Sequence, residues 1–163
     1  PDELTLALEY SDVEHIKLPF NIMDHRWMTT VEKLRASRRE RQVVVHARSA
    51  FLQGLLLSDS LSAWARAHVP EPGPIRSWLS AQAEAAGYDD VAAFCIAFVR
   101  SQDWIDGVVV GVDSDTQLRK AVAFFDQKQL SAQQLEQLAD DRPILTARSL
   151  DPSQWASNWR APQ

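Results

Sequence analysis

The sequence predicts an α/β fold built on a short parallel β-sheet. Three runs of β-branched or alternating residues, at about 14–18, 43–47 and 108–112, are typical of strands. Segments with helical periodicity separate these runs along the chain. Strands that alternate with helices in this way pair in parallel through right-handed crossovers. A chain of 163 residues is also long enough to enclose one substantial core.

The first segment, Pro1-Asp2-Glu3, predicts the start of a helix. Proline fits a first turn, and the two acids face the positive end of the helix dipole. Leu4 and Leu8 then supply a buried stripe. The first strand follows at 14–18, and Pro19 is expected to end it because proline cannot donate a ladder hydrogen bond.

The residues Thr29-Thr30-Val31-Glu32 match a capping box, which predicts a helix that continues to about Gln42. Acidic residues dilute its basic ones, so we expect a solvated outer face and no nucleic-acid site. The basic residues are Lys33, Arg35, Arg38, Arg39 and Arg41. The run 43–47 is the clearest strand of the chain. Residues 53–74 then lack periodicity and end in prolines and a glycine, which predicts an irregular loop.

Two helices are predicted between this loop and the third strand. The first begins near residue 75 and ends at Gly87, because a glycine after a periodic run is typical of a helix C-terminus. Its apolar stripe comprises Ile75, Trp78, Leu79, Ala83 and Ala86. The second helix covers about 90–101 and is apolar nearly all round, so we expect it to be buried.

Two further capping boxes, at 114–117 and 131–134, each predict a helix after the third strand. Leu130 and Leu135 are spaced as a hydrophobic staple for the second of these helices. The first carries an apolar stripe that we expect to be buried, formed by Leu118, Ala121, Val122 and Phe125. From about residue 143 we expect an irregular tail, which contains Trp155 and Trp159.

Composition and charge argue against several classes of protein. The net charge of -5 disfavours non-specific binding to nucleic acid or to an anionic membrane. The longest apolar run, 91–99, is far shorter than the roughly 20 residues that span a bilayer. The single cysteine, Cys95, excludes an internal disulfide, and no signal peptide is visible, so a cytoplasmic location is expected. The four histidines show no zinc spacing, so no metal site is predicted.

Three strands are too few for a closed parallel barrel. Such a barrel needs eight strands and about 250 residues. The chain is therefore expected to be either a small open α/β domain or part of something larger. Because uncovered strand edges pair readily with other chains, we also expect a homo-oligomer formed through the exposed edges.

Four segments together resemble the aldo/keto reductase family. HIKLPFNIMDHRW at 15–27 looks like the sixth barrel strand and its loop, and VVVHARSAFLQGLLL at 43–57 looks like the seventh. VVVGVDSDTQLRKAV at 108–122 looks like the eighth strand and the start of the following helix, and DPSQW at 151–155 resembles the tail. The resemblance implies that residues 1–163 are a single partial domain. This domain would be the C-terminal part of a (β/α)8 TIM barrel, with its tail from about residue 143.

The family resemblance implies an oxidoreductase that uses NADP or NAD and acts on a small carbonyl or alcohol. In that family the catalytic tyrosine, lysine, aspartate and histidine belong to the second to fourth strands, which would precede Pro1. Neither Tyr10 nor Tyr88 lies where the match requires a tyrosine. We therefore expect no catalytic residue in this chain, and a fragment that carries cofactor-binding loops but is inactive alone.

The resemblance assigns a first group of cofactor contacts to the sixth and seventh strands. Ser49, Leu52 and Gln53 stand where the loop after the seventh strand wraps the pyrophosphate. Arg48 falls where many members place an aromatic that stacks on nicotinamide, and a guanidinium stacks too. Lys17 replaces a glutamine that usually holds the carboxamide.

A second group lies near the adenosine phosphate in the family pattern. Asp113, Ser114 and Gln117 match these positions, and Ser114 begins a helix, where anions bind readily. Gln117 replaces an arginine that often binds the 2′-phosphate, whereas Lys120 and Ala121 replace an acid and an asparagine that hold adenine. These departures leave open a second hypothesis, a non-catalytic barrel that keeps the fold for binding or assembly.

Strand alternation suggests that His15, Lys17, His46 and Arg48 share one face, which would be the barrel lumen. One interpretation is an anion site at the carboxyl ends of the strands. For the two histidines we prefer ordinary core packing. Lys17 also permits a third hypothesis, a Schiff-base lyase, which requires a buried lysine; pairing with Asp24 is the favoured alternative.

The tryptophans allow one further set of predictions. Trp78 lies on a helical stripe and is expected in the core. Trp27 and Trp64 are expected in loops at the mouth, where they either line a substrate site or cover the loops.

Overall fold

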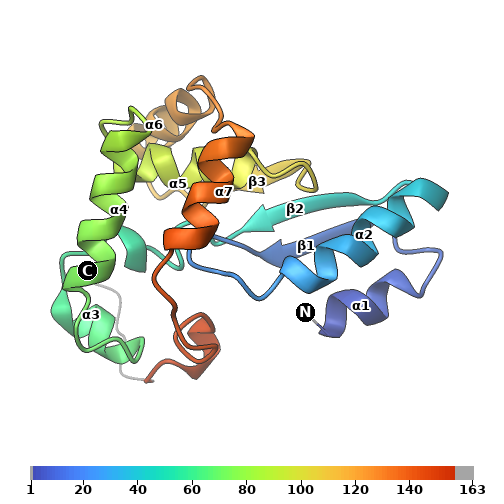
Figure 1. Cartoon of the computed structure of the whole chain (residues 1–163), viewed down its shortest axis with the longest axis horizontal. Coiled ribbons are helices and arrows are strands. Elements are labelled where there is room, and N and C mark those ends of the chain that lie inside the picture. Colours follow the sequence, from blue (N-terminus) through green and yellow to red (C-terminus); the bar gives the residue numbers. More distant parts are fainter. Residues whose placement is uncertain (1, 157–163) are drawn as a thin grey trace.

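The computed structural model describes residues 2–156 and contains a three-stranded parallel sheet in the order β1-β2-β3 (Figure 1). The strands are β1 (His15–Pro19), β2 (Val44–Arg48) and β3 (Gly107–Val109). All three lie close to the predicted runs, although β1 includes its proline and β3 is shorter than expected. Within the described part of the chain, β1 and β3 each leave one edge without a neighbouring strand.

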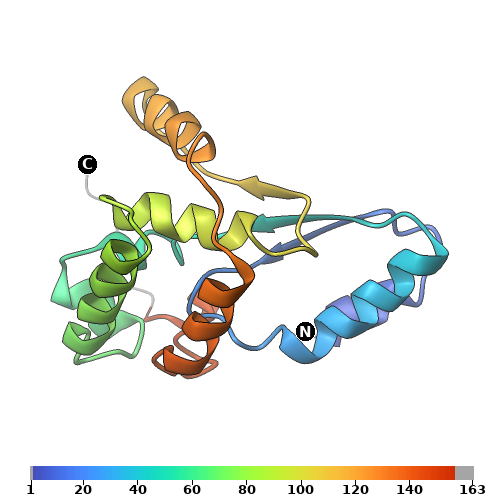
Figure 2. The ribbon, with the colours of Figure 1, turned by 45° about the horizontal axis from the view of Figure 1, so that its top comes forward.

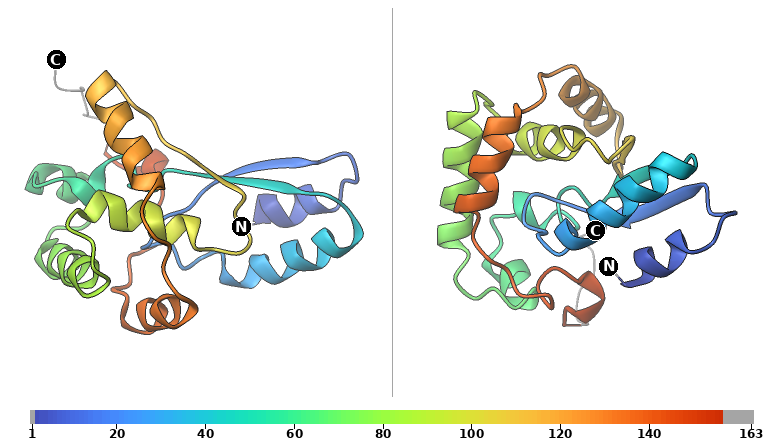
Figure 3. Two further views of the ribbon diagram at one scale, coloured as in Figure 1. Left: turned by 90° about the horizontal axis from the view of Figure 1, so that it is seen from above. Right: turned by 45° about the vertical axis from the view of Figure 1, so that its right-hand side comes forward.

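Two helices lie on one side of the sheet (Figure 3). They are α1 (Asp2–Leu8) and α2 (Met28–Glu40), which pack against each other. The predicted capping box of α2 is wrong, because Trp27 is the N-cap and no side chain caps the helix. The preceding turn fixes the start instead: Asp24 accepts hydrogen bonds from the backbone N–H of Arg26 at 3.2 Å and from Trp27 Nε1 at 3.1 Å.

The stretch predicted to be irregular contains two short helices, η1 (Leu55–Leu57) and α3 (Leu61–Arg66). The Ser60 hydroxyl caps α3 by accepting the Ala63 N–H at 3.3 Å. Trp64 is therefore helical and fully buried, and its Nε1 donates to the Ser58 carbonyl at 2.9 Å. The sequence prediction missed α3 because six residues are too few to show a helical period.

The next two helices agree with the sequence. In α4 (Gly73–Ala85) the stripe is buried or half-buried, Trp78 included, and Gly87 follows the helix with a φ of 78°. In α5 (Val91–Arg100) the eight residues from Ala92 to Val99 are all buried. The Asp90 side chain caps α5 by accepting the Ala92 N–H at 2.7 Å.

The last two helices differ from each other in burial. The capping box of α7 (Ala132–Asp141) is present as predicted, with Ser131 and Gln134 bonded reciprocally. By contrast, α6 (Asp115–Phe125) has no buried residue, so the predicted burial of its stripe is wrong. Leu118 and Val122 are 49% and 57% exposed. The helix packs on α5 but otherwise stands away from the body (Figure 2), so its stripe stays largely uncovered by residues 2–156.

The tail from residue 143 is mostly irregular and contains one 3-10 turn, η2 (Pro152–Gln154). Trp155 is held there by a hydrogen bond from its Nε1 to the Ser149 carbonyl at 3.0 Å. Trp159 lies outside the described residues, as does Pro1.

Candidate functional site

Four basic side chains share the open face of the sheet, as strand alternation predicts. His15 and Lys17 alternate with more buried residues along β1, and His46 and Arg48 do the same along β2. The register places Lys17 beside His46, and Pro19 beside Arg48. The parallel pairing therefore gathers the four side chains on two neighbouring strands.

The two histidines do not pack in a core, so that expectation is wrong. His15 is exposed and His46 is half-buried, and their rings stack with centroids 6.4 Å apart. His46 lies against Gly107, where an added Cβ would stand 2.6 Å from ring carbon Cδ2. Lys17 and Arg48, beside these rings, are exposed as well, so this face of the sheet is open.

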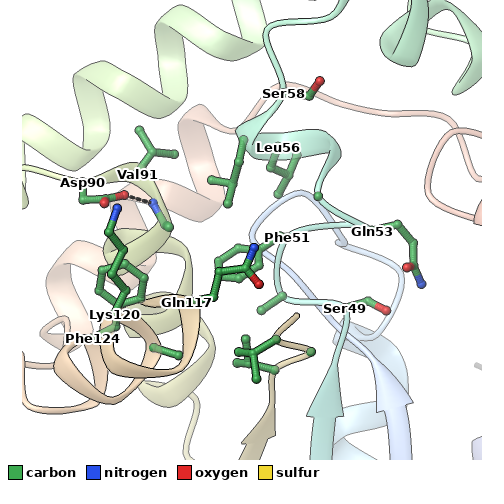
Figure 4. Close-up of a pocket in the computed structure, with 18 of the residues that line it drawn as sticks. Ser49, Phe51, Gln53, Leu56, Ser58, Asp90, Val91, Gln117, Lys120 and Phe124 are labelled. Carbon is green, nitrogen blue, oxygen red and sulfur yellow. Dashed lines mark hydrogen bonds between the residues drawn. The ribbon is translucent and has the colours of Figure 1, made fainter. Parts of the chain in front are cut away.

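A hollow of about 990 Å³, here called the main hollow, opens at the carboxyl ends of β2 and β3 (Figure 4). Its walls are the loop that follows β2, the start of α5 and the segment from β3 into α6. Arg48, Ser49, Gln53, Asp113 and Gln117, all predicted cofactor contacts, line it. Carboxyl ends of parallel strands are where barrel and open α/β proteins bind their ligands.

The loop after β2 has an unusual backbone. Ser49, Leu52, Gln53 and Gly54 all have positive φ, from 48° to 81°, a conformation that non-glycine residues adopt at a cost of about 1–3 kcal/mol and that clusters at functional sites. Leu52 anchors the loop with a buried side chain, and its N–H donates to the Ser49 carbonyl at 2.8 Å. The N–H groups of Gln53 and Gly54 have no acceptor among the described residues. They are therefore available to an anion.

The start of α6 forms the opposite wall of the main hollow. The Ser114 hydroxyl accepts the Gln117 N–H at 3.2 Å, as predicted, but the Gln117 side chain accepts the N–H of Asp113, at 2.7 Å, instead of that of Ser114. Ser114 borders neither the main hollow nor the hollow beside β1, and it serves the helix cap. The side-chain NH2 of Gln117 remains available as a neutral donor.

Acidic residues slightly outnumber basic ones around the main hollow. The acids are Asp59, Asp89, Asp90 and Asp113, and the bases are Arg48, Arg76 and Lys120. Arg76 is in an ion pair with Asp59. The Lys120 side chain extends toward Asp90 (Figure 4). Arg76, Asp89 and Asp90 were not among the predicted contacts, because they belong to helices or helix caps whose sequence signal is one of packing.

A second hollow of about 600 Å³, the edge hollow, lies at the free edge of β1. Lys17 and Leu52 line it, while Arg48 and Ser49 line both hollows, which therefore meet at these two residues. Lys17 thus lies apart from the predicted contacts near α6. Asp151, at the start of η2, also borders the edge hollow, and hydrogen bonds from Gln154 and Ser153 hold the pKa of its carboxyl below the usual range.

The expected pairing of Lys17 with Asp24 is wrong. Asp24 is buried and binds the Arg26 guanidinium through two hydrogen bonds, of 2.8 and 2.6 Å, which raises the pKa of Arg26. Lys17 itself is exposed. The Schiff-base hypothesis requires a buried lysine, so the structure does not favour it.

The tryptophans expected at the mouth are core residues. Trp64 is fully buried, and Trp27 is buried beside Asp24, although it also borders the edge hollow. Tyr88 is buried too, and its hydroxyl donates to the Lys128 carbonyl at 2.5 Å. Burial raises the pKa of Tyr88, so this phenol is poorly placed to give up a proton.

No group of three or more His, Cys, Asp or Glu side chains within residues 2–156 is arranged to hold a metal ion. In the same part of the chain, no helix is long and apolar enough to cross a membrane.

These elements have the fold of part of a (β/α)8 barrel. The chain is similar in structure to aldo-keto reductase AKR11C1 from Bacillus halodurans. The apo form of that protein matches with a TM-score of 0.65 and 17% sequence identity, over 91% of this chain and 51% of that one. The holo form matches with a TM-score of 0.63 and 17% identity, over 91% of this chain and 50% of that one.

The chain therefore spans about half the length of the structures it matches. At this level of identity the likeness establishes the fold alone. No protein-family model and no curated protein matches the sequence.

Proposed function

We propose that this chain supplies the nucleotide-binding half of an NAD(P)-dependent oxidoreductase that acts on a small carbonyl or alcohol. The main hollow, at the carboxyl ends of β2 and β3, carries the proposal. Its volume is at the upper end of the range of roughly 300–1,000 Å³ typical of small-molecule sites. The fold likeness to an aldo-keto reductase that has a holo form supports it.

In this proposal the two walls of the main hollow bind different parts of the cofactor. The N–H groups of Gln53 and Gly54, with the Ser49 hydroxyl, hold the pyrophosphate, because oriented amides form good anion sites. Gln117 and Lys120 face the adenosine end, and the Arg48 guanidinium stacks on the nicotinamide. A bound nicotinamide would supply the hydride.

Neither tyrosine of the described chain is placed to donate a proton during that hydride transfer. Tyr88 is buried and bonded to Lys128, and Tyr10 lies exposed after α1. We therefore propose that residues 1–163 bind cofactor but do not turn over a substrate without a further segment or chain. The buried, unpaired Cys95 suits a reducing compartment, and we propose the cytoplasm.

We further propose that the site prefers NAD over NADP. The 2′-phosphate of NADP adds up to two negative charges to a hollow in which acids outnumber bases. Asp113 stands beside the α6 start, and Gln117 offers only a neutral donor.

The test is a calorimetric titration of the full chain with NAD and with NADP. We expect NAD to bind at least about tenfold tighter than NADP. Lys120→Met should weaken the binding of both nucleotides, because each lost charge-assisted bond is worth ~1.5–3 kcal/mol. The double change Asp113→Asn with Gln117→Arg should reduce the preference for NAD over NADP. Lys33→Met, on the exposed side of α2, is the control. Absence of binding by both nucleotides would contradict the proposal.

A non-catalytic binding or assembly role is the second candidate, favoured by the exposed apolar stripe of α6 and the free edges of β1 and β3. In that case the edges pair with a second copy of the chain. Light scattering at increasing protein concentration tests this, because an assembly role predicts a mass that rises with concentration. A chain that stays monomeric and binds nucleotide would favour the nucleotide-binding function over the assembly function.

A further inference from the structure

We propose that the edge hollow binds the carboxylate of a small organic acid, held by Lys17 and Arg48. Both cations line the hollow, and both are exposed. Neither has a carboxylate partner among residues 2–156, whereas five arginines do: Arg26, Arg35, Arg38, Arg76 and Arg119. Several other cations of the chain are also without such a partner, but Lys17 and Arg48 lie on neighbouring strands and line one hollow, which favours an external anion there.

The strand register brings the two cations within reach of one ligand. Lys17 pairs with His46, and Arg48 lies two residues further along β2 on the same face. Strand spacing and rise place their Cα atoms about 8 Å apart, a gap that two long side chains close around one carboxylate. Ser49 follows Arg48 directly and adds a hydroxyl donor at the rim.

The acids that border the edge hollow are engaged elsewhere. Asp151 accepts hydrogen bonds from the side chains of Ser153 and Gln154, both at 2.7 Å. Glu3 has an interaction partner of its own. The hydrogen bonds that Asp151 accepts come from Ser153 and Gln154 and not from Lys17 or Arg48, so this carboxylate leaves the two cations available.

The remaining lining indicates the rest of the ligand. Leu4, Ala7, Ile16 and Trp27 add apolar surface beside the cations. A carboxylate on a short hydrocarbon chain fits this combination, because the charged end meets Lys17 and Arg48 while the chain lies on apolar surface. A free phosphate ion would use only the charged part of the site.

The position of the edge hollow links it to the proposed chemistry. The two hollows share Arg48 and Ser49, so an acid in the edge hollow lies next to whatever occupies the nicotinamide end of the main hollow. The substrate class is then a carbonyl compound, or its alcohol, that carries a carboxylate. This last step depends on the proposed function, whereas the anion site itself does not.

The test compares butyrate with butyramide, which have the same shape and differ in charge, by amide NMR titration of the full 15N-labelled chain at low salt. We expect saturable shifts at Lys17, Arg48 and Ser49 with butyrate and none with butyramide. Lys17→Met and Arg48→Leu should each weaken butyrate binding about tenfold, as for the loss of one charge-assisted contact. Lys17→Arg, which keeps the positive charge, should retain butyrate binding.

Two exposed residues of α2 provide matched controls, Lys33→Met and Arg39→Leu, which remove the same charges away from the hollow. Equal weakening by the controls, equal binding of butyramide, or phosphate binding as tight as butyrate binding would overturn the proposal. An NAD titration of the same sample distinguishes the carboxylate site in the edge hollow from the proposed nucleotide-binding function. Nucleotide binding without butyrate binding ends this inference alone, whereas butyrate binding without nucleotide binding ends the proposed function alone.

Discussion

Helices α5 and α6 have similar lengths and both carry apolar residues, nearly all round in α5 and along one stripe in α6, yet their environments are opposite. The eight residues 92–99 of α5 are buried, whereas α6 has no buried residue and leaves Leu118, Val122 and Phe125 exposed. The two helices pack on each other, so one face of α6 is covered by α5 and the other by nothing described. An apolar stripe therefore shows which face of a helix requires a partner, but not whether the chain contains that partner.

The largest effect expected from this comparison concerns stability. Phe94→Ala in α5 should reduce the free energy of unfolding by about 3–5 kcal/mol, because a fully buried ring leaves a cavity. Phe125→Ala in α6 should cost less than about 1 kcal/mol, since much of that ring is already in contact with water. Urea unfolding of both variants measures the difference. Equal losses would mean that α6 is covered in solution.

Thiol reactivity offers a second test of the difference in burial between α5 and α6. Burial raises the pKa of the Cys95 thiol to about 12 from 9.0, which reduces its thiolate fraction roughly a thousandfold. Native protein should therefore resist iodoacetamide at pH 8 and react after unfolding. Val122→Cys in a Cys95→Ala background should react at once, and rapid labelling of native Cys95 would contradict the burial of α5. Because the folded pKa is raised, this thiol's contribution to stability is complete below pH 9 and declines as pH rises above it.

The helix caps should show a smaller difference. Ser131→Ala removes the hydroxyl that accepts the Gln134 N–H in the capping box of α7, whose Leu138 is buried, and should cost about 1 kcal/mol of global stability. Ser114→Ala should loosen α6 without destabilising the core, because α6 contributes no buried residue. Hydrogen exchange distinguishes local from global loss. If both variants lost the same amount of amide protection throughout the chain, the expected difference between the two caps would be wrong.

A change in the exposed stripe of α6 should have the smallest effect on stability and the largest effect on self-association of the chain. Val122→Gln should change the unfolding free energy by no more than about 0.5 kcal/mol, as for an exposed site. If the exposed stripe pairs with another copy, the same variant should lower the mass measured by light scattering. Gln133→Asn, on the exposed surface of α7, is a suitable control. An unchanged mass would exclude the stripe from any self-association.

The candidate site was only partly predictable from the sequence. Arg48, Ser49, Gln53, Asp113 and Gln117 follow two strands whose signals are clear, so their convergence on one hollow follows from parallel pairing. Arg76 and the start of α5 complete the hollow, but their patterns indicate packing, not binding. The hydrogen bonds that Asp24 accepts from Arg26 and Trp27, and the Ser60 cap of the helix that contains Trp64, leave no periodic signal.

The sequence alone determined the order of the three strands and of the longer helices, the parallel sheet, the common face of Lys17 and Arg48, and the buried character of α5. Each of these follows from local periodicity and strand alternation, which short segments carry by themselves. Only the tertiary structure decided that His15 is exposed and His46 half-buried, that the α6 stripe is uncovered, and that Arg48 borders two hollows. Burial and convergence depend on which distant surfaces meet, and no local pattern contains that information.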